Sequence, residues 1–279
     1  MREISAGLIS REVTRLCIEA NMRLPEDVRK AMEAAHLSEP WPVARDTLGV
    51  LCSNMCAAES RGLPVCQDTG MACVFMEIGQ DVHISGDLYA AVNEGVARGY
   101  TGGFLRKSVV ADPLRRLNTG DNTPALITVD IVPGDRLRLT VAPKGFGSEN
   151  MSRLAMLKPA DGAEGVKNFV VETVKLAGAN PCPPVILGVG IGGSFDKVAQ
   201  LAKHALLRPV DRPNGDEYYA AMERELLERI NSLGIGPQGF GGRTTALGVN
   251  IEVMPTHVAG LPVAVNVSCH VTRRAGCVL

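Results

Sequence analysis

Hydrophobic residues recur at helical spacing along the first part of the chain, residues 1–60. Between residues 3 and 36 this spacing predicts two amphipathic helices. Pro25 is expected at the start of the second helix, because proline is tolerated in the first helical turn. A third helix is predicted over residues 43–60, so the chain begins with a helical segment.

Two cysteines lie one turn apart on the third predicted helix. Cys52 and Cys56 stand beside Leu48 and Leu51, on a face that we expect to be buried. Because a cysteine thiol often behaves as a small hydrophobic group, both are interpreted as core residues.

From residue 61 onward, short apolar strands alternate with amphipathic helices. Strands are predicted at residues 71–79 and 183–190, and several more within the alternating stretch 249–275. In the stretch 125–147, apolar and polar residues alternate on both sides of the turn Pro-Gly-Asp, which predicts a β-hairpin. Residues 144–150 are expected to form a glycine loop at the end of this hairpin. Helices are predicted within residues 81–103, 162–179, 194–208 and 217–234.

This succession predicts a mixed α/β fold, in which β-sheets are flanked by helices behind a helical N-terminal segment. No repeat or composition break divides the chain. We therefore predict one domain over residues 1–279, with residues 1–60 as the helical segment and residues 61–279 as the body that carries the functional site.

One long polar segment, residues 105–124, has more hydrogen-bonding capacity than a simple connection needs. Such segments usually form surface loops, and loops often carry function. Its polar side chains are Arg106, Lys107, Arg115, Arg116, Asn118, Asp121 and Asn122.

Composition excludes several classes of partner. Lys and Arg number 29 against 30 Asp and Glu, and aromatic residues make up 4% of the chain, so neither phosphate neutralisation nor base stacking is favoured. The longest apolar run is broken by glycines, and the first residues lack the apolar core of a signal peptide. We expect a cytoplasmic protein that binds a small molecule, with no membrane or nucleic acid as partner.

Eight cysteines in a reducing compartment are expected to act as thiols, metal ligands or catalytic groups, not as disulfides. Cys66, Cys182 and Cys269 differ from the others, because each lies where a loop meets a predicted strand. Their spacing fits no zinc motif and no ferredoxin motif, so spacing alone leaves their role open.

A set of motifs in fixed order gives these cysteines a context. The chain resembles the alpha part of class I fumarate hydratases and of the related L-tartrate dehydratases, from about Cys66 to Arg273. The motifs that carry the resemblance are CQDTG, GGFLRKS, LNTGDNTP, APKGFGSEN, NPCPP, GIGGSFDKV, GPQGFGGRTTALGV and MPTHVAGLPVAVNVSCH.

The resemblance implies an enzyme that adds water to fumarate, or removes it from a closely related hydroxy acid. It implies a 4Fe-4S cluster held by Cys66, Cys182 and Cys269, with one iron that no cysteine binds. Thiolates are soft ligands that suit such a cluster, and an iron with an open position acts as a Lewis acid.

The resemblance also implies residues for a dicarboxylate substrate. Arg106 would pair with one carboxylate, as a planar guanidinium can. Gln67 and Asp68 would contact the substrate, Gly147 would offer a backbone N–H, and His257 would act near Asp68 in proton handling or orientation.

Each of these residues has a simpler interpretation. Arg106 is also explained as a surface charge on a loop, and Asp68 as a turn former. His257 lies in an apolar stretch, where a single histidine is often a hydrogen-bonded core residue.

Gly188, Gly190 and Gly193 form the pattern G-x-G-x-x-G between a predicted strand and a predicted helix, which favours a nicotinamide-dependent oxidoreductase as an alternative. The expected second strand with a terminal acidic residue is missing, since Asp211 has the distance without the strand. We interpret the glycines as positions of close backbone approach near the cluster, with the following helix directed at an anionic group.

Fused members of the family carry a second region that supplies the catalytic base, which implies a separate beta subunit and a hetero-oligomer for this chain. The alternative is that the chain is the alpha subunit of an L-tartrate dehydratase. A non-catalytic cluster-binding subunit is a further alternative, because the base is expected on the partner.

Overall fold

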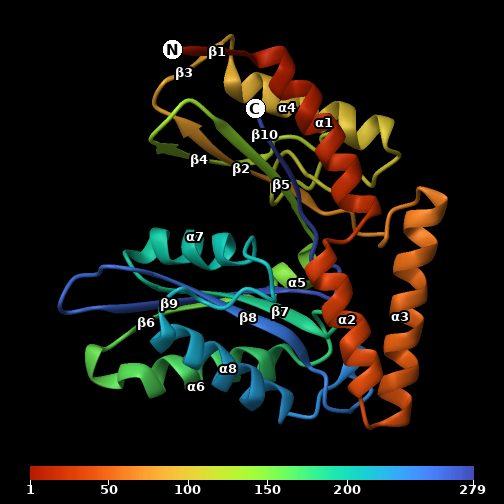
Figure 1. Ribbon diagram of the computed structural model, residues 1–279, viewed down its shortest axis with the longest axis vertical. Helices are drawn as coiled ribbons and strands as arrows, with labels where there is room; N and C mark the ends of the chain where they lie inside the picture. Colours follow the sequence, from red (N-terminus) through yellow and green to blue (C-terminus); the bar gives the residue numbers. More distant parts are fainter. The chain divides into compact units, whose positions relative to one another are not determined.

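The computed structural model describes all residues from Met1 to Leu279, and its fold is mixed α/β with helices flanking β-sheets, as predicted. No helix is both long and apolar enough to cross a membrane. The chain packs into two compact units (Figure 1). Unit 1 comprises Met1–Pro25, Met55–Phe146 and Arg273–Leu279, and unit 2 comprises Glu26–Asn54 and Gly147–Thr272.

Unit 1 is built on a four-stranded sheet in the order β10-β5-β2-β4. Its strands are β2 (Met71–Gly79), β4 (Leu126–Val132), β5 (Leu137–Lys144) and β10 (Ala275–Val278). Helices α1 (Ala6–Met22) and α4 (Leu88–Gly102) pack against each other, and α1 also lies against β5 and β10. Two short strands, β1 (Arg2–Ser5) and β3 (Val82–Ser85), pair in parallel.

The predicted hairpin is wrong, although both of its strands exist. β2 lies between β4 and β5, parallel to the first and antiparallel to the second. β2 is largely apolar and buried, and a central position gives hydrogen-bond partners to both of its backbone edges. The Pro-Gly-Asp turn bends around the end of β2, where the Asp81 N–H donates to the Gly134 carbonyl over 2.9 Å.

Unit 2 is built on a second four-stranded sheet in the order β6-β9-β7-β8. Its strands are β6 (Arg153–Leu157), β7 (Val185–Gly192), β8 (Ala246–Met254) and β9 (Leu261–Ser268). β7 is buried throughout, as its apolar sequence predicts, whereas β6 was not predicted. β9 is antiparallel to β7, so the start of β7 and the end of β9 meet at one edge of the sheet.

Helices cover both faces of this second sheet (Figure 1). α7 (Phe195–Ala205) lies on one face, and α6 (Gly162–Ala177) and α8 (Glu217–Asn231) lie on the other. The chain also forms α2 (Glu26–Ser38), α3 (Pro42–Arg61) and the short helix α5 (Phe146–Glu149), the last of which replaces part of the predicted glycine loop.

The burial of Cys52 and Cys56 was predicted wrongly. Cys56 is exposed and Cys52 is half-buried. The buried side of α3 passes through Leu48 and Met55, and Cys56 is turned about 100° from Met55 around the helix axis. Its thiol therefore points away from the core.

The glycines of the G-x-G-x-x-G pattern have a packing role. A Cβ on Gly188 would lie 2.0 Å from the Ala202 carbonyl oxygen, and one on Gly190 would lie 2.3 Å from that of Val198. Both acceptors belong to α7. The backbone that approaches these glycines is therefore the helix that covers β7, which accounts for the pattern without a dinucleotide.

Candidate functional site

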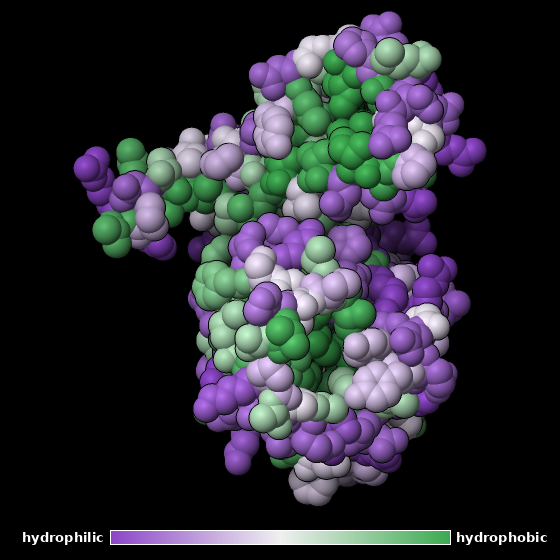
Figure 2. Space-filling view, turned by 90° about the vertical axis from the view of Figure 1, so that its left-hand side faces the viewer, coloured by the Kyte–Doolittle hydropathy of each residue, from purple (hydrophilic) through white to green (hydrophobic).

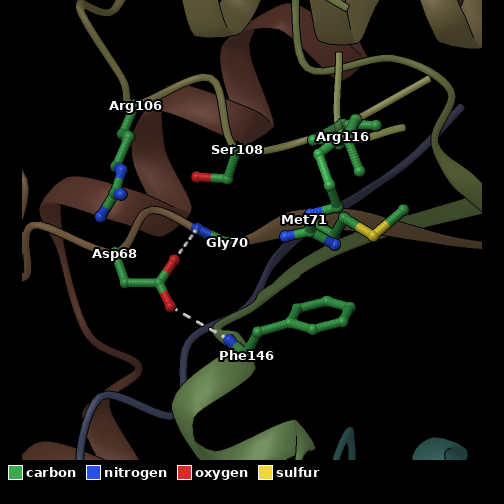
Figure 3. A pocket seen from close by; sticks show the side chains of 9 residues that line it. Asp68, Gly70, Met71, Arg106, Ser108, Arg116 and Phe146 are labelled. Atoms are coloured by element: carbon green, nitrogen blue, oxygen red, sulfur yellow. Dashed lines mark hydrogen bonds between the residues drawn. The ribbon is translucent and has the colours of Figure 1, made fainter. Parts of the chain in front are cut away.

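A cavity of about 300 Å³ lies within unit 1, at the lower end of the sizes typical of small-molecule sites. Figure 3 shows that Asp68 and Arg106, two residues predicted from the sequence, face this cavity. Its lining residues are Asp68, Gly70, Met71, Arg106, Ser108, Val109, Val110, Arg116 and Phe146.

Asp68 lies just before the start of β2, where two backbone N–H groups hold its carboxylate. Its Oδ1 accepts the Gly70 N–H and its Oδ2 accepts the Phe146 N–H, each over 3.0 Å (Figure 3). The first bond is the turn expected of an aspartate two residues before a glycine. Because each carboxylate oxygen can accept a further hydrogen bond, Asp68 forms this turn and still offers acceptors to the cavity.

Arg106 has an exposed side chain without an ion pair or a side-chain hydrogen bond in the chain. Its backbone is nevertheless fixed, since the Thr69 hydroxyl donates to the Arg106 carbonyl over 3.1 Å. The loop that carries Arg106 is thus joined to the loop that carries Asp68.

Asn122 joins the same two loops from behind the cavity. The side chain is fully buried; its Oδ1 accepts the N–H groups of Ser108 and Val109 over 2.7 and 3.2 Å, and its Nδ2 donates to the Gly70 carbonyl over 3.1 Å. The amide oxygen thus binds one segment of the cavity wall, and the amide nitrogen binds the other. In the sequence, Asn122 stands out only as one member of the polar segment 105–124.

Two more buried side chains hold the Asp68 loop. The Tyr100 hydroxyl lies 2.9 and 3.0 Å from the carbonyl oxygens of Thr69 and Gly70, and Nη2 of Arg273 donates to the Asp68 carbonyl over 2.5 Å. Burial raises the pKa of Tyr100 far above its ordinary value, so the hydroxyl stays protonated and donates. The carbonyls of this turn therefore all have buried partners.

The two predicted ligands of unit 2 lie in neighbouring loops. Cys182 precedes β7 and Cys269 follows β9, and the pairing of Ile186 with Ser268 brings these strand ends together. The backbone N–H of His270 donates to the Cys182 carbonyl over 3.4 Å, and Nδ1 of His270 lies 3.0 Å from the same oxygen.

Gln238 holds the Cys182 loop in place through Pro183, the residue that follows Cys182. Both the backbone N–H and the side-chain Nε2 of Gln238 donate to the Pro183 carbonyl over 2.7 Å. The same Nε2 lies 3.3 Å from Nδ1 of His270. Gln238 belongs to the glycine-rich motif GPQGFGG and was not singled out from the sequence.

Cys66, the third predicted ligand, belongs to unit 1. Its thiol is half-buried and lies 3.4 Å from Oε1 of Gln67, whose side chain is exposed. By contrast, Cys17 is fully buried, and burial raises its pKa to about 12, so its thiol stays protonated and is a poor metal ligand. No group of three or more Cys, His, Asp or Glu side chains is assembled to hold a metal ion.

His257 and Gly147 belong to unit 2. His257 lies exposed in the loop between β8 and β9, so the interpretation as a core histidine is wrong. The Ala259 N–H donates to its Nδ1 over 3.2 Å, which leaves the proton of the neutral ring on Nε2. Gly147 is exposed at the second position of α5, where backbone N–H groups have no partner within the helix.

A second cavity, of about 260 Å³, lies in unit 2 between α6, α8 and the end of β7. Its lining includes Val166, Ile191, Met222 and Leu261 and has no charged side chain. Figure 2 shows hydrophobic residues gathered around a hollow on this unit. A charged substrate therefore fits the cavity of unit 1 better than this one.

Comparison with known proteins shows which family the chain matches. Residues 10–278 match the model of the family described as fumarate hydratase (Fumerase). The chain is 44% identical over 274 residues to the putative L(+)-tartrate dehydratase subunit alpha of Methanocaldococcus jannaschii, with 96% of each chain covered. It is 34% identical over 256 residues to the L(+)-tartrate dehydratase subunit alpha of Escherichia coli UTI89, which covers 90% of this chain and 84% of the relative.

Proposed function

We propose, because the chain belongs to the fumarate hydratase family and is a hydro-lyase, that it catalyses the reversible hydration of fumarate to malate. The observation that carries this proposal is the cavity of unit 1, into which Asp68 and Arg106 project together. The chain would act as one subunit of a cytoplasmic hetero-oligomer. The names of the relatives, each a subunit alpha, support a separate beta subunit that supplies the remaining catalytic residues.

Arg106 would bind one carboxylate of the substrate. The guanidinium has no anionic partner in the chain, and its planar fork matches a carboxylate through two hydrogen bonds. Gln67, exposed next to Cys66, would add a polar contact, and the N–H of Gly147 would donate to a substrate oxygen.

Asp68 and His257 would handle the proton and the hydroxyl group. Hydration places a hydroxyl on one carbon and a proton on its neighbour, so the site needs an oriented acceptor and a donor. The fixed carboxylate of Asp68 would orient the hydroxyl group or water through its remaining lone pairs. Nε2 of His257, which carries the proton in the neutral ring, would donate a hydrogen bond that orients the hydroxyl group or water, while the proton of the neighbouring carbon would pass to and from the base of the beta subunit.

Cys66, Cys182 and Cys269 would hold a 4Fe-4S cluster. Their surroundings fit this group, because all three lie outside the cores, and the loops of Cys182 and Cys269 are tied together through His270. When bound, a cluster with one iron free of cysteine supplies a Lewis acid that polarises the carbon–oxygen bond of the hydroxyl group. The base on the other side of the substrate would come from the beta subunit.

L-tartrate is the second candidate substrate, and the names of the relatives favour it. Tartrate has one more hydroxyl than malate, so a site that binds this group would discriminate strongly. The test is anaerobic kinetics of the chain reconstituted with its beta subunit, on fumarate, malate and L-tartrate. The highest kcat/KM is expected for the fumarate–malate pair; a preference for tartrate would reassign the substrate, and no turnover of any of the three would refute the proposal.

A further inference from the structure

We infer that two copies of this chain pair edge to edge along β4 (Leu126–Val132), so that their unit 1 sheets join into one. The observation that carries the inference is a row of backbone groups on this strand without hydrogen-bond partners. The inference concerns assembly, and it goes beyond the proposed function.

β4 has one open edge. It is the last strand of its sheet and pairs only with β2 (Figure 1). The Gln80 N–H donates to the Val132 carbonyl over 2.8 Å, so the backbone groups of Val132 face β2. These groups alternate in direction along a strand, and the pairing with β2 runs without a register shift. The residues of β4 whose backbone groups face outward are therefore Ile127, Val129 and Ile131.

These outward groups have no partner within the chain, because no side chain and no backbone group bonds to their N–H or carbonyl groups. The edge strand β8 of the other sheet differs. There the Ile251 N–H donates to Glu223 over 2.7 Å, and the Ile251 carbonyl accepts from the Asn214 side chain over 2.8 Å. The chain thus covers one edge with its own side chains and leaves the edge of β4 free for a strand.

β4 also lacks the features that keep an exposed edge from pairing. Its sequence, LITVDIV, has no proline, lysine or glycine, and its single charged residue is Asp130. Edge strands that remain unpaired usually carry such residues or are very short. Ile131 is 63% exposed, so an apolar side chain stands at this edge. An open apolar edge of this length is a template for another strand.

A second copy fits this edge in one register. An antiparallel pair centred on Val129 places Val129 opposite itself and Ile127 opposite Ile131 of the other copy. All of these residues face outward, so their backbones form about six N–H to carbonyl bonds across the interface. Because the contact is symmetric, it closes on two copies, and the two four-stranded sheets become one.

The residues that flank β4 match the same register. Ala125 precedes the strand, and its N–H already donates to Oδ1 of Asn93 over 2.8 Å. Pro133 follows the strand and has no N–H. With Val129 at the centre, Ala125 lies opposite Pro133 of the other copy, so the two residues that cannot donate meet. The register therefore uses every free outward donor of the strand.

Charge complementarity also favours a second copy in this register. Asp130 lies opposite Thr128 of the other copy, whose hydroxyl is a donor that a carboxylate accepts. Moving the centre to Asp130 would place two carboxylates directly opposite each other, where like charges repel.

The test uses the chain with its beta subunit and bound cluster, and compares Ile131→Pro with Ile131→Thr. Proline removes an N–H that has no partner within one copy, whereas threonine keeps it, so both variants are expected to melt near the wild-type temperature. Proline deletes two hydrogen bonds between the copies. We expect the dissociation constant of the two copies, from sedimentation velocity, to rise by about 10- to 100-fold in Ile131→Pro and to stay unchanged in Ile131→Thr.

A charge pair tests the register without proline. Thr128→Asp places a carboxylate opposite Asp130 of the other copy, so we expect the copies to separate. Adding Asp130→Lys restores an attractive pair, and the double variant is expected to associate again. If Ile131→Pro does not fold, this pair of variants decides the question.

Hydrogen exchange identifies what covers the edge. The amides of the three outward residues are expected to be protected in the wild-type assembly and to exchange fast once the copies separate. A wild-type particle with one copy of this chain, unchanged association in Ile131→Pro, or no rescue by Asp130→Lys would overturn the inference. Protected outward amides in a particle with one copy would overturn it as well, and would assign the edge to the beta subunit.

Discussion

Asn122 illustrates how single buried side chains shape the cavity of unit 1. Its amide bonds to three backbone groups in two loops, and its own φ is +67°, a conformation that asparagine tolerates better than most residues. The two loops carry Asp68 and Arg106. The positions of Asp68 and Arg106 therefore depend on one buried residue that is not part of the cavity lining.

We expect Asn122→Ala to lower the free energy of unfolding by about 1–3 kcal/mol, because buried backbone groups lose their partner. The displaced loops should also lower kcat/KM for fumarate. Chemical denaturation and steady-state kinetics measure the two effects. Asn118→Ala is the control, since Asn118 is an exposed residue of the same loop with a hydrogen bond to the Lys107 carbonyl; similar losses in both variants would contradict a special role for Asn122.

Residues that belong to a recognisable motif could be predicted from the sequence. Residues whose role depends on hydrogen bonds to distant backbone groups could not. Asp68 and Arg106 were predicted, and both line one cavity. Tyr100 and Arg273 were not, because their partners are carbonyl groups 30 to 205 positions away. No local pattern records such a pairing.

At the scale of elements, the sheet of unit 2 depends on close packing of α7 against β7. Gly190 lies beneath the helix, where a Cβ would meet the Val198 carbonyl oxygen at 2.3 Å. We expect Gly190→Ala to destabilise the protein by about 1–3 kcal/mol, because the helix must move outward. Thermal denaturation against Gly215→Ala, a site with nothing within 4 Å, provides the comparison; equal melting temperatures would contradict the packing role.

Glu39, between α2 and α3, fixes the loop that leads into β8. It is 2% exposed and accepts hydrogen bonds from the N–H groups of Arg243 and Thr244. Burial raises its pKa, but these bonds and that of the Thr244 hydroxyl lower it more, so its pKa lies below the ordinary value. The charged carboxylate therefore stabilises the fold above the unfolded pKa of about 4.3, and this contribution is lost as pH falls through the folded-state pKa.

We expect Glu39→Gln to lower the free energy of unfolding by about 1–3 kcal/mol at neutral pH. The difference from wild type should shrink as the pH falls below the unfolded pKa of about 4.3, and it should vanish as the pH falls through the lowered folded-state pKa, where the wild-type carboxylate becomes protonated. Urea denaturation over a pH series measures this. A difference that grows in acid, or that does not depend on pH, would contradict the account.

Elements themselves were predicted better than their pairing. The strands β2, β4 and β5 are visible in the sequence, but the insertion of β2 between the other two is not. A turn between two alternating segments favours a hairpin only when no buried strand competes for the same edge. β2 comes earlier in the chain and takes both inner edges.

For the whole molecule, the proposed cluster depends on cysteines from both units, Cys66 in unit 1 and Cys182 and Cys269 in unit 2. We expect serine at any one of these positions to abolish the visible absorbance of anaerobically reconstituted protein, since serine is a harder ligand. Cys56→Ser is the control, because Cys56 is exposed and outside the proposed ligand set. Equal bleaching in all four variants, or in none, would refute the ligand assignment.

An iron with an open position is exposed to oxidants, so we expect the reconstituted enzyme to lose activity in air and to recover it with iron and thiol under anaerobic conditions. Activity before and after exposure measures this. Full activity in air and in the presence of a chelator would exclude a labile cluster.

The claim on which the account depends is that the unit 1 cavity binds the substrate, and Arg106 tests it most directly. The measurement is kcat/KM for fumarate under anaerobic conditions. It compares Arg106→Lys with Lys107→Arg, a substitution at the next residue that also keeps the charge. We predict a fall of about 10- to 100-fold for Arg106→Lys, because lysine cannot reproduce the two-hydrogen-bond contact with a carboxylate, and no change for Lys107→Arg. Wild-type kcat/KM in both variants, with full cluster content, would contradict the account.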